Sequence, residues 1–312
     1  MNQSSIMQGC PDLQQLSQGA ICDGMALTVL DAHGPEAADF LHKQLTQDVL
    51  HLQADEVRYA GYCNNKGRLQ AIMLVWRAGP EHIRLLCPAQ LAPGLHKRLS
   101  MFILRAKVKL SISDLQVLRL CGAGSDGASG IAPLRHAQAH NLCVLRLPDS
   151  CGIARHLWLA PRESTLPASL PQQPAAGGDW LDVRSGMAWI TEATFEAFVP
   201  QMVNLEVLGG VNFKKGCYPG QEVVARSQYL GKLKRRMFLA HSALDALPAG
   251  VEVFGAEDPE QACGQLVLSA PAPEGGVDCL IELKTAFSGD QLSAGGAALR
   301  LLELPYQIPV QE

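Results

Sequence analysis

From residue 237 onward the chain consists of short apolar runs separated by Gly/Pro turns. The runs lie at 237–240, 251–254, 262–268, 278–283 and 298–301. Runs this short, at this spacing, are typical of antiparallel strands that close into a small barrel. The sequence therefore predicts a C-terminal β-barrel domain at 237–312, preceded by a larger domain at 1–236.

The first 236 residues mix strand and helix patterns. Runs at 57–63 and 69–77 flank an Asn/Gly-rich turn, which predicts a β-hairpin. Residues 36–45 and 89–102 carry apolar side chains at helical spacing. Two strand–helix–strand halves are broadly alike, which fits an internal duplication. The sequence thus predicts an α+β fold.

Composition excludes several classes of protein. A net charge of −4 argues against a protein that coats nucleic acid. None of the ten cysteines forms a Cys-x-x-Cys motif, so a zinc or clustered iron–sulfur site has no local support and no resident metal is expected. The polar residues 1–21 lack the order of a signal peptide, and the apolar run at 71–76 is too short for a membrane span. We expect a cytoplasmic protein without a membrane partner.

Cys217 is the residue most expected to do chemistry. It follows Lys214 and Lys215 and precedes a Pro-Gly turn, and residues 221–230 read as a helix. Because a thiol reacts as the thiolate, nearby cations and a helix N-terminus are the usual means of activating it. We therefore predict a reactive Cys217 whose charge is favoured by Lys215. The alternative is a small buried hydrophobic side chain in a tight turn.

Residues 215–222, Lys-Gly-Cys-Tyr-Pro-Gly-Gln-Glu, resemble the K-G-C-Y-x-G-Q-E signature of the YgfZ family of folate-binding proteins. These are relatives of the glycine-cleavage T-protein that take part in iron–sulfur enzyme maintenance and tRNA modification. The resemblance covers nearly the whole chain and is strong across about residues 195–236. Residues 44–49 are similar to the family's Q-x-T-x-D-V segment. That segment is explained equally well as a helix exit capped by Thr46 and Asp48. The resemblance implies a duplicated T-protein-like folate-binding domain before the barrel.

The resemblance also implies a ligand site for tetrahydrofolate or a derivative. In the family, aromatic residues that contact folate match Trp180 and, less closely, Met25. The candidate folate-binding residues are Met25, Trp180, Arg184, Tyr218, Gln221, Glu222 and Arg226. Trp180 is equally explained by core or interdomain packing, and Arg184 by pairing near Asp182.

One feature of the T-protein is missing. Its counterpart of the strand at 69–77 carries a carboxylate early in the strand, whereas residues 69–74 here are Leu-Gln-Ala-Ile-Met-Leu. A proton-handling step needs a titratable group within hydrogen-bond reach. The resemblance therefore implies an accessory protein, with turnover uncertain. It would bind tetrahydrofolate and use Cys217 to support assembly or repair of iron–sulfur enzymes, including tRNA-thiolating ones. The alternative is a folate-dependent aminomethyltransferase or other one-carbon transferase.

Basic residues cluster around the signature. They are Lys214, Lys215, Arg226, Lys232, Lys234, Arg235 and Arg236, with Glu222 the only acid in the same stretch. Such a local positive field attracts phosphates or a polyglutamate tail, although lysines also protect a solvated edge strand. A nucleic-acid-binding module is a third hypothesis. The partners that the resemblance implies are folate, iron–sulfur enzymes or their assembly proteins, a transient iron–sulfur cluster, and tRNA through client enzymes.

Overall fold

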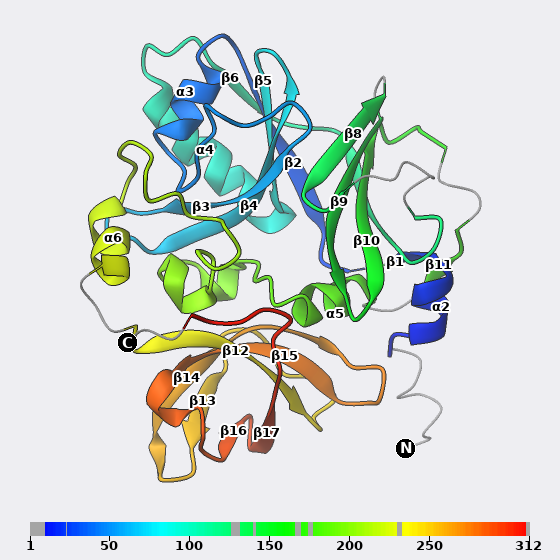
Figure 1. Ribbon diagram of the computed structural model, residues 1–312, viewed down its shortest axis with the longest axis vertical. Coiled ribbons are helices and arrows are strands. Elements are labelled where there is room, and N and C mark those ends of the chain that lie inside the picture. Colours follow the sequence, from blue (N-terminus) through cyan, green and yellow to red (C-terminus); the bar gives the residue numbers. More distant parts are fainter. Residues whose placement is uncertain are drawn as a thin grey trace.

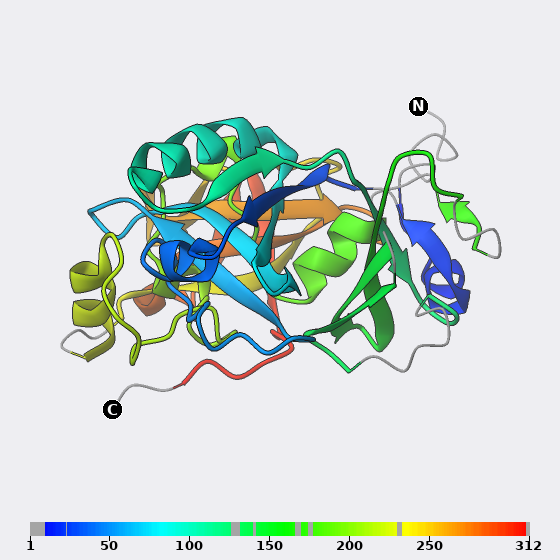
Figure 2. The same ribbon diagram turned by 90° about the horizontal axis from the view of Figure 1, so that it is seen from above.

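The structure is a computed structural model in which two sheets and a closed barrel make up the protein (Figure 1). It describes residues 10–22, 24–125, 132–139, 142–165, 170–173, 177–229 and 233–309. Helices α2 and α6 lie at opposite ends of the molecule in both views (Figures 1 and 2). No helix in these ranges is long and apolar enough to cross a membrane.

The first sheet has five antiparallel strands in the order β3-β4-β5-β2-β6. They are β2 (Leu27–His33), β3 (Val57–Cys63), β4 (Leu69–Gly79), β5 (His82–Pro88) and β6 (Lys109–Ile112). The hairpin predicted for the third and fourth strands is confirmed, because β3 pairs with β4 across the 64–68 turn.

Helices cover this sheet. They are α3 (Ala37–His42), the 3-10 turn η2 (Ala89–Leu91) and α4 (Ala92–Ile103). Leu95 and Leu99 of α4 are buried, one turn apart, as the apolar spacing predicts. The outer face of α4 stays in water, and Met101 is exposed there.

The second sheet has six strands in the order β11-β1-β7-β10-β9-β8. They are β1 (Ala20–Cys22), β7 (Gln116–Cys121), β8 (Arg135–Ala139), β9 (Leu142–Ser150), β10 (Ile153–Ala160) and β11 (Gln172–Gln173). Strands β9 and β10 pair antiparallel, with Trp158 opposite Val144. Helix α2 (Leu13–Gln18) leads into β1, and its first turn is capped by the Asp12 carboxylate, which accepts hydrogen bonds from two backbone N–H groups.

Helix α5 (Gly177–Arg184) lies between the second sheet and the barrel (Figure 1). The 3-10 turns η3 (Glu192–Thr194) and η4 (Pro200–Val203) and helix α6 (Gln221–Tyr229) follow it. The periodicity of the sequence does not predict α5. Trp180, Leu181, Asp182 and Val183 are all buried, so the helix has no polar face to set a 3.6-residue period.

The barrel is closed in the order β12-β15-β14-β13-β16-β17 and is antiparallel throughout. Its strands are β12 (Arg235–Ser242), β13 (Glu252–Gly255), β14 (Asp258–Pro271), β15 (Val277–Lys284), β16 (Leu292–Ala294) and β17 (Ala297–Leu302), with the 3-10 turn η5 (Thr285–Phe287) after β15. The expected α+β class with a small antiparallel barrel is confirmed. The division into domains after residue 236 stays a prediction.

Candidate functional site

The loop at residues 212–220, here called the signature loop, is held against the β3–β4 hairpin. Its Asn212 N–H donates to the carbonyl of Thr46 over 2.9 Å. The Thr46 hydroxyl donates to the carbonyl of Gly210 and accepts from the Gly61 N–H, so one buried side chain joins three segments. Residues 44–49 therefore do more than end a helix, because they anchor the loop that carries Cys217.

Gly220 lets the signature loop reach the hairpin turn. Its φ is +78°, in the left-handed region that favours glycine. A Cβ there would lie 2.4 Å from the carbonyl oxygen of Asn64 and 2.5 Å from the nitrogen of Gly67. The backbone of the loop thus rests directly on the backbone of the turn, and α6 begins at the next residue.

Cys217 is exposed, so it is not a small core side chain. Lys215 beside it is half-buried, and its ammonium donates to the carbonyl oxygens of His42 and Leu45. The same ammonium lies 4.7 Å from the centre of the Tyr218 ring, within cation–π range. Lys215 is therefore fixed in place beside Cys217 instead of extending into water.

The ionisation of Lys215 reflects this position. Burial lowers the pKa of Lys215 to about 8, while the negative charges of Asp48 and of the Cys217 thiolate raise it. The charge of a nearby thiolate thus favours the ammonium form of Lys215, and the role predicted for this lysine toward Cys217 stays a prediction. Near neutral pH, Lys215 remains largely protonated.

His42 and Asp48 complete the polar surroundings, and sequence reasoning did not assign them to the site. The two side chains are 3.1 Å apart, and the Asp48 carboxylate also lies 2.7 Å from the ring nitrogen of His51. Burial, followed by the charge of Lys215, lowers the pKa of His42. Burial opposes ionisation of Asp48, but hydrogen bonds from His51 outweigh it and lower the carboxyl pKa. The Q-x-T-x-D-V segment at 44–49 includes Asp48 but not His42.

The other candidate residues near the signature differ in exposure. Tyr218 is buried, its burial raises the pKa of the phenol, and its hydroxyl has no hydrogen-bond partner among the described residues. Gln221 is partly exposed at the start of α6, and Glu222 and Arg226 are exposed further along it. All three lie on the helix that follows Cys217. None of them lines the cavity beside Trp180.

Trp180 lines a cavity of about 200 Å³ between α5 and the barrel. Its indole N–H donates to the Asp278 carboxylate over 2.8 Å. The ring nitrogen Nδ1 of His241 lies 2.9 Å from the same carboxylate. The aromatic ring of Trp180 is therefore held in one orientation by a carboxylate of β15.

Arg184 belongs to this cavity and not to the surroundings of Asp182. Its guanidinium lies 3.4 Å from the Asp278 carboxylate and 5.9 Å from the centre of the Trp180 ring. Asp182 is instead bound by Arg155 and by the Trp189 indole. Arg184 therefore pairs with the barrel, beside the proposed ligand position.

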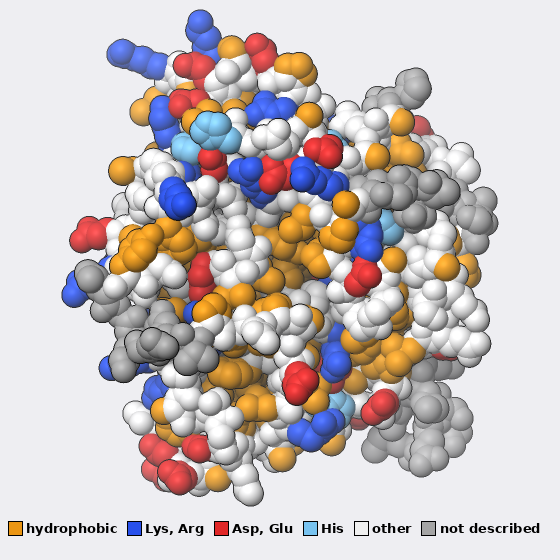
Figure 3. Space-filling model, viewed as in Figure 1, with side chains coloured by type: hydrophobic (Ala, Val, Ile, Leu, Met, Phe, Trp, Pro, Cys, Tyr) orange, Lys and Arg blue, Asp and Glu red, His pale blue; other side chains and the backbone are white. Residues whose placement is uncertain are grey.

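Met25 precedes β2 and contacts the first turn of α5. Its N–H donates to the Asp179 carboxylate over 2.7 Å, and its carbonyl accepts from Arg119 over 2.6 Å. The structure thus brings Met25 close to the residue before Trp180. On the face seen in Figure 3, hydrophobic side chains gather near the centre, between the sheets and the barrel. Cys217 is not among the described residues that line the Trp180 cavity.

The basic run around the signature is not a continuous surface patch. Arg236 is buried and paired with Glu206, and Arg235 is paired with Glu282 over 2.6 Å. The charges of these two arginines in the expected local positive field are therefore neutralised by ion pairs. Of the remaining five, Lys214, Arg226 and Lys234 are exposed, Lys215 is half-buried, and Lys232 lies outside the described residues.

A carboxylate does reach the strand where the sequence lacks one. Glu196 accepts a hydrogen bond from the Gln70 side chain over 2.5 Å. That hydrogen bond lowers the pKa of Glu196. The acid comes from a segment 126 residues away in the chain, so nothing in residues 69–74 could have indicated it.

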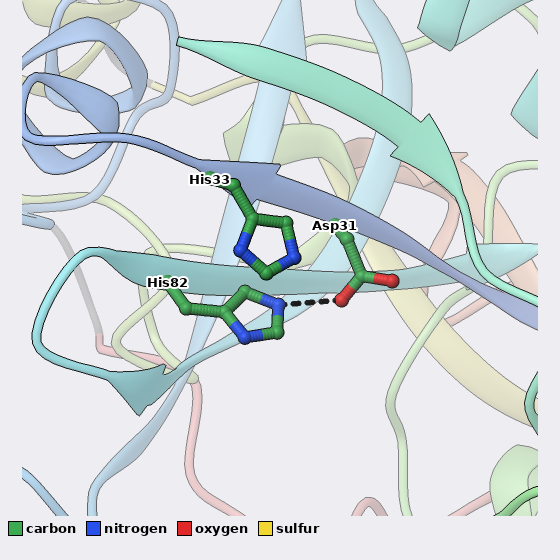
Figure 4. A group of neighbouring side chains, drawn as sticks. All are labelled: Asp31, His33 and His82. Atoms are coloured by element: carbon green, nitrogen blue, oxygen red, sulfur yellow. Dashed lines mark hydrogen bonds and ion pairs between the residues drawn. The ribbon is translucent and has the colours of Figure 1, made fainter.

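One cluster offers donor atoms suited to a metal ion (Figure 4). The donor atoms of Asp31, His33 and His82 lie within 4.8 Å of one another. The two imidazoles are stacked with ring centres 3.7 Å apart, however, and Arg84 also donates to Asp31. Burial opposes ionisation of Asp31, but the hydrogen bonds from His82 and Arg84 lower its pKa to about 2. Because the positive Arg84 already neutralises the carboxylate, we assign no metal to this cluster.

The fold is that of the aminomethyltransferases T. The glycine cleavage system aminomethyltransferase T from Bartonella henselae matches with a TM-score of 0.77 at 16% identity, over 94% of this chain and 87% of that one. No family model matches the chain. Two curated relatives are named tRNA-modifying protein YgfZ. The protein from Sodalis glossinidius is 30% identical over 88% of this chain and 89% of its own length, and that from Edwardsiella ictaluri is 28% identical over 91% of each. This chain belongs to the YgfZ family.

The contact of Gly220 with the hairpin turn predicts a position-specific cost. Gly220→Ala should lower the free energy of unfolding by about 1 kcal/mol for the left-handed backbone and by roughly 2 kcal/mol more for the steric overlap. Gly209→Ala is the matched control, because Gly209 has φ +74° but no atom within 4 Å of the added Cβ. Urea unfolding of both variants measures the difference, and equal losses would contradict the docking of the loop.

The lowered pKa of Lys215 predicts how stability depends on pH. Between the folded-state pKa of about 8 and the higher unfolded-state pKa, the unfolded chain binds more protons, so wild-type stability should rise with pH relative to Lys215→Met. Urea unfolding from pH 7 to 10, under reducing conditions, measures the two slopes. Lys214→Met, which alters an exposed lysine, should run parallel to wild type. A Lys215→Met curve that also runs parallel would show that Lys215 is not desolvated.

Proposed function

We propose that the protein binds tetrahydrofolate or a derivative. We further propose that it supports assembly or repair of iron–sulfur enzymes, including enzymes that thiolate tRNA, through Cys217. The observation that carries the proposal is an exposed Cys217 thiol beside the fixed ammonium of Lys215. Membership of a family whose relatives are named for tRNA modification supports the same role. A protein that serves such enzymes would act in the cytoplasm.

The Trp180 cavity is the proposed folate site. Its volume of about 200 Å³ is below the roughly 300–1,000 Å³ of most ligand pockets, so it suits a pterin ring with the rest of the ligand outside. Trp180 is buried but borders the cavity, and a pterin there would stack on the part of its ring that faces the cavity. Asp278 fixes the orientation of that ring through the indole N–H. Arg300 lines the same cavity and would attract the carboxylates of the glutamate tail, whereas Arg184 is already paired with Asp278 there.

Cys217 is the proposed sulfur nucleophile or iron ligand. Both roles need the thiolate, and the Lys215 ammonium is the cation placed to stabilise it. A cluster held there would be cargo passing to a client enzyme. Ligand or client contacts would also involve Met25 beside the first turn of α5 and, next to Cys217, the side chains of Gln221, Glu222 and Arg226.

Contact with tRNA is proposed to run through the client enzymes. Arg235 and Arg236 are occupied by ion pairs with Glu282 and Glu206, so they are not available to bind phosphates. The exposed basic side chains that remain around the signature are too few to neutralise a long stretch of nucleic-acid backbone.

Aminomethyl or other one-carbon transfer is the second candidate function, favoured by the Glu196 carboxylate that reaches Gln70. Its lowered pKa makes Glu196 a weak base near neutral pH, so we expect no turnover with an aminomethyl donor and tetrahydrofolate. Turnover in that assay that is lost in Glu196→Gln would establish the transferase instead.

The folate site predicts a loss of affinity in Trp180→Leu. Removing the stacking surface should weaken tetrahydrofolate binding about tenfold, because an aromatic pair contributes roughly 1–1.5 kcal/mol. Isothermal titration calorimetry on the full chain measures the affinity. Trp158→Leu is the matched control, since Trp158 is a buried tryptophan of β10 that does not line the cavity. Equal affinities for the two variants would show that folate does not bind in this cavity.

The role of Cys217 predicts a cellular phenotype. In cells whose own copy is deleted, Cys217→Ser should fail to sustain thiolation of tRNA under oxidative stress, measured by mass spectrometry of tRNA nucleosides. Cys10→Ser, which changes a partly exposed cysteine elsewhere, should behave as wild type. Full thiolation in cells that carry Cys217→Ser at normal protein levels would refute the proposed role.

A further inference from the structure

Two cysteines outside the signature loop, Cys22 of β1 and Cys121 of β7, lie side by side. Strands β1 and β7 are antiparallel, with Ala20 opposite Cys121 and Cys22 opposite Arg119. Cys22 and Cys121 are thus diagonal neighbours on one face of the sheet, where side chains two residues apart share a side. Their Sγ atoms are 2.7 Å apart. That separation is within about 1 Å of the roughly 2.05 Å of a disulfide bond.

The surroundings of this pair favour thiol chemistry. Both cysteines are buried and line a narrow cavity of about 10 Å³ that Arg119 and Arg155 also line. Guanidinium groups stabilise a thiolate, and such a volume holds about one water-sized molecule. Hydrogen peroxide, with two oxygen atoms, needs only slight widening of this cavity, whereas a bulky disulfide reagent needs the sheet to open.

We propose that Cys22 and Cys121 form an intramolecular disulfide when the protein meets hydrogen peroxide. The Cys121 thiolate attacks one peroxide oxygen, so that an S–O bond forms, the O–O bond breaks and hydroxide leaves with the proton of the Cys22 thiol. The Cys22 thiolate then attacks the Cys121 sulfur, the S–S bond forms, and the second hydroxide leaves and is protonated to water. In total, two thiols and one peroxide give one disulfide and two waters, and the sulfurs lose two electrons.

The order of attack follows from the contact between the sulfurs. The hydrogen bond from Cys22 lowers the pKa of the Cys121 thiol, and the same contact raises the pKa of Cys22. Cys121 is therefore the first thiolate and Cys22 the resolving thiol. By contrast, burial raises the pKa of Cys63, Cys87 and Cys143, which disfavours the reactive form.

The disulfide would fasten β1 to β7. The two cysteines are 99 residues apart, and a cross-link over a long loop restricts the unfolded chain strongly. Met25 lies three residues beyond Cys22, and Arg119 opposite Cys22 donates to the Met25 carbonyl. Oxidation therefore acts on the segment that contacts the first turn of α5. The inference rests on β1 and β7 alone and stands or falls separately from the proposed role of Cys217.

The test uses the full chain, reduced and then exposed to a modest excess of hydrogen peroxide. After the remaining thiols are blocked with N-ethylmaleimide, digestion and mass spectrometry should show a peptide that links Cys22 to Cys121 and that a dithiol reductant separates. The thermal midpoint of the oxidised protein should rise by roughly 5 °C. The same linkage should form in Cys217→Ser, which keeps this result independent of the signature loop.

Two single substitutions test which cysteines form the disulfide. Cys121→Ser should lose the linked peptide, whereas Cys143→Ser, which removes a buried cysteine of the same sheet, should keep it. Because the linkage is measured first in the wild-type chain, a variant that fails to fold does not decide the outcome. The proposal is overturned if Cys217 is oxidised while Cys22 and Cys121 remain alkylatable after unfolding, or if the two cysteines appear as separate sulfinic acids.

Discussion

Burial of α5 is the constraint on which the rest of the structure depends. A helix with buried charged groups needs a partner for each of them, because an unpaired buried charge costs several kcal/mol. Asp182 of α5 meets Arg155 from the second sheet, while Trp180 and Arg184 of α5 meet Asp278 from the barrel. The sheet and the barrel are therefore joined through the two sides of one helix, and the Trp180 cavity exists because they meet there.

A second set of polar contacts ties the signature loop to the same framework. The Gln201 amide donates to the Val224 carbonyl of α6, and the Asn204 amide donates to the Met237 carbonyl of β12. Arg236 and Glu206 form an ion pair in the same region, and the Arg236 guanidinium also donates to the Gln201 carbonyl. Breaking such a buried pair leaves one charge uncompensated. The η4 turn and the residues directly after it therefore contact both α6 and β12. These contacts fix α6, and with it the exposed cysteine, relative to the barrel.

The parts of the fold that could be predicted from sequence are those that local patterns determine. Alternation and turns predict the β3–β4 hairpin and the barrel, and residue order places Lys215 beside Cys217. Helix α5 could not be found, because burial on all sides removes the amphipathic period. The basic run suggests a surface field only because the acids that neutralise two of its arginines lie 30 and 47 residues away. Long-range pairing of this kind leaves no local trace, and the same holds for Glu196 beside Gln70 and for Cys22 beside Cys121.

The arrangement of the candidate groups limits how the proposed folate ligand and Cys217 could act together. Trp180 lines a cavity against the barrel, whereas Cys217 belongs to a loop docked on the 64–68 turn and is not among the described residues around that cavity. A pterin enclosed beside Trp180 would not touch the Cys217 sulfur in this arrangement. Any influence of the ligand on the cysteine must then pass through the shared framework, by stabilising the conformation in which α5, the barrel and α6 are assembled. Direct one-carbon transfer from such a pterin to the thiol has no geometric support, whereas the proposed accessory role, in which the ligand stabilises the assembled protein and Cys217 acts apart from it, is compatible with the separation.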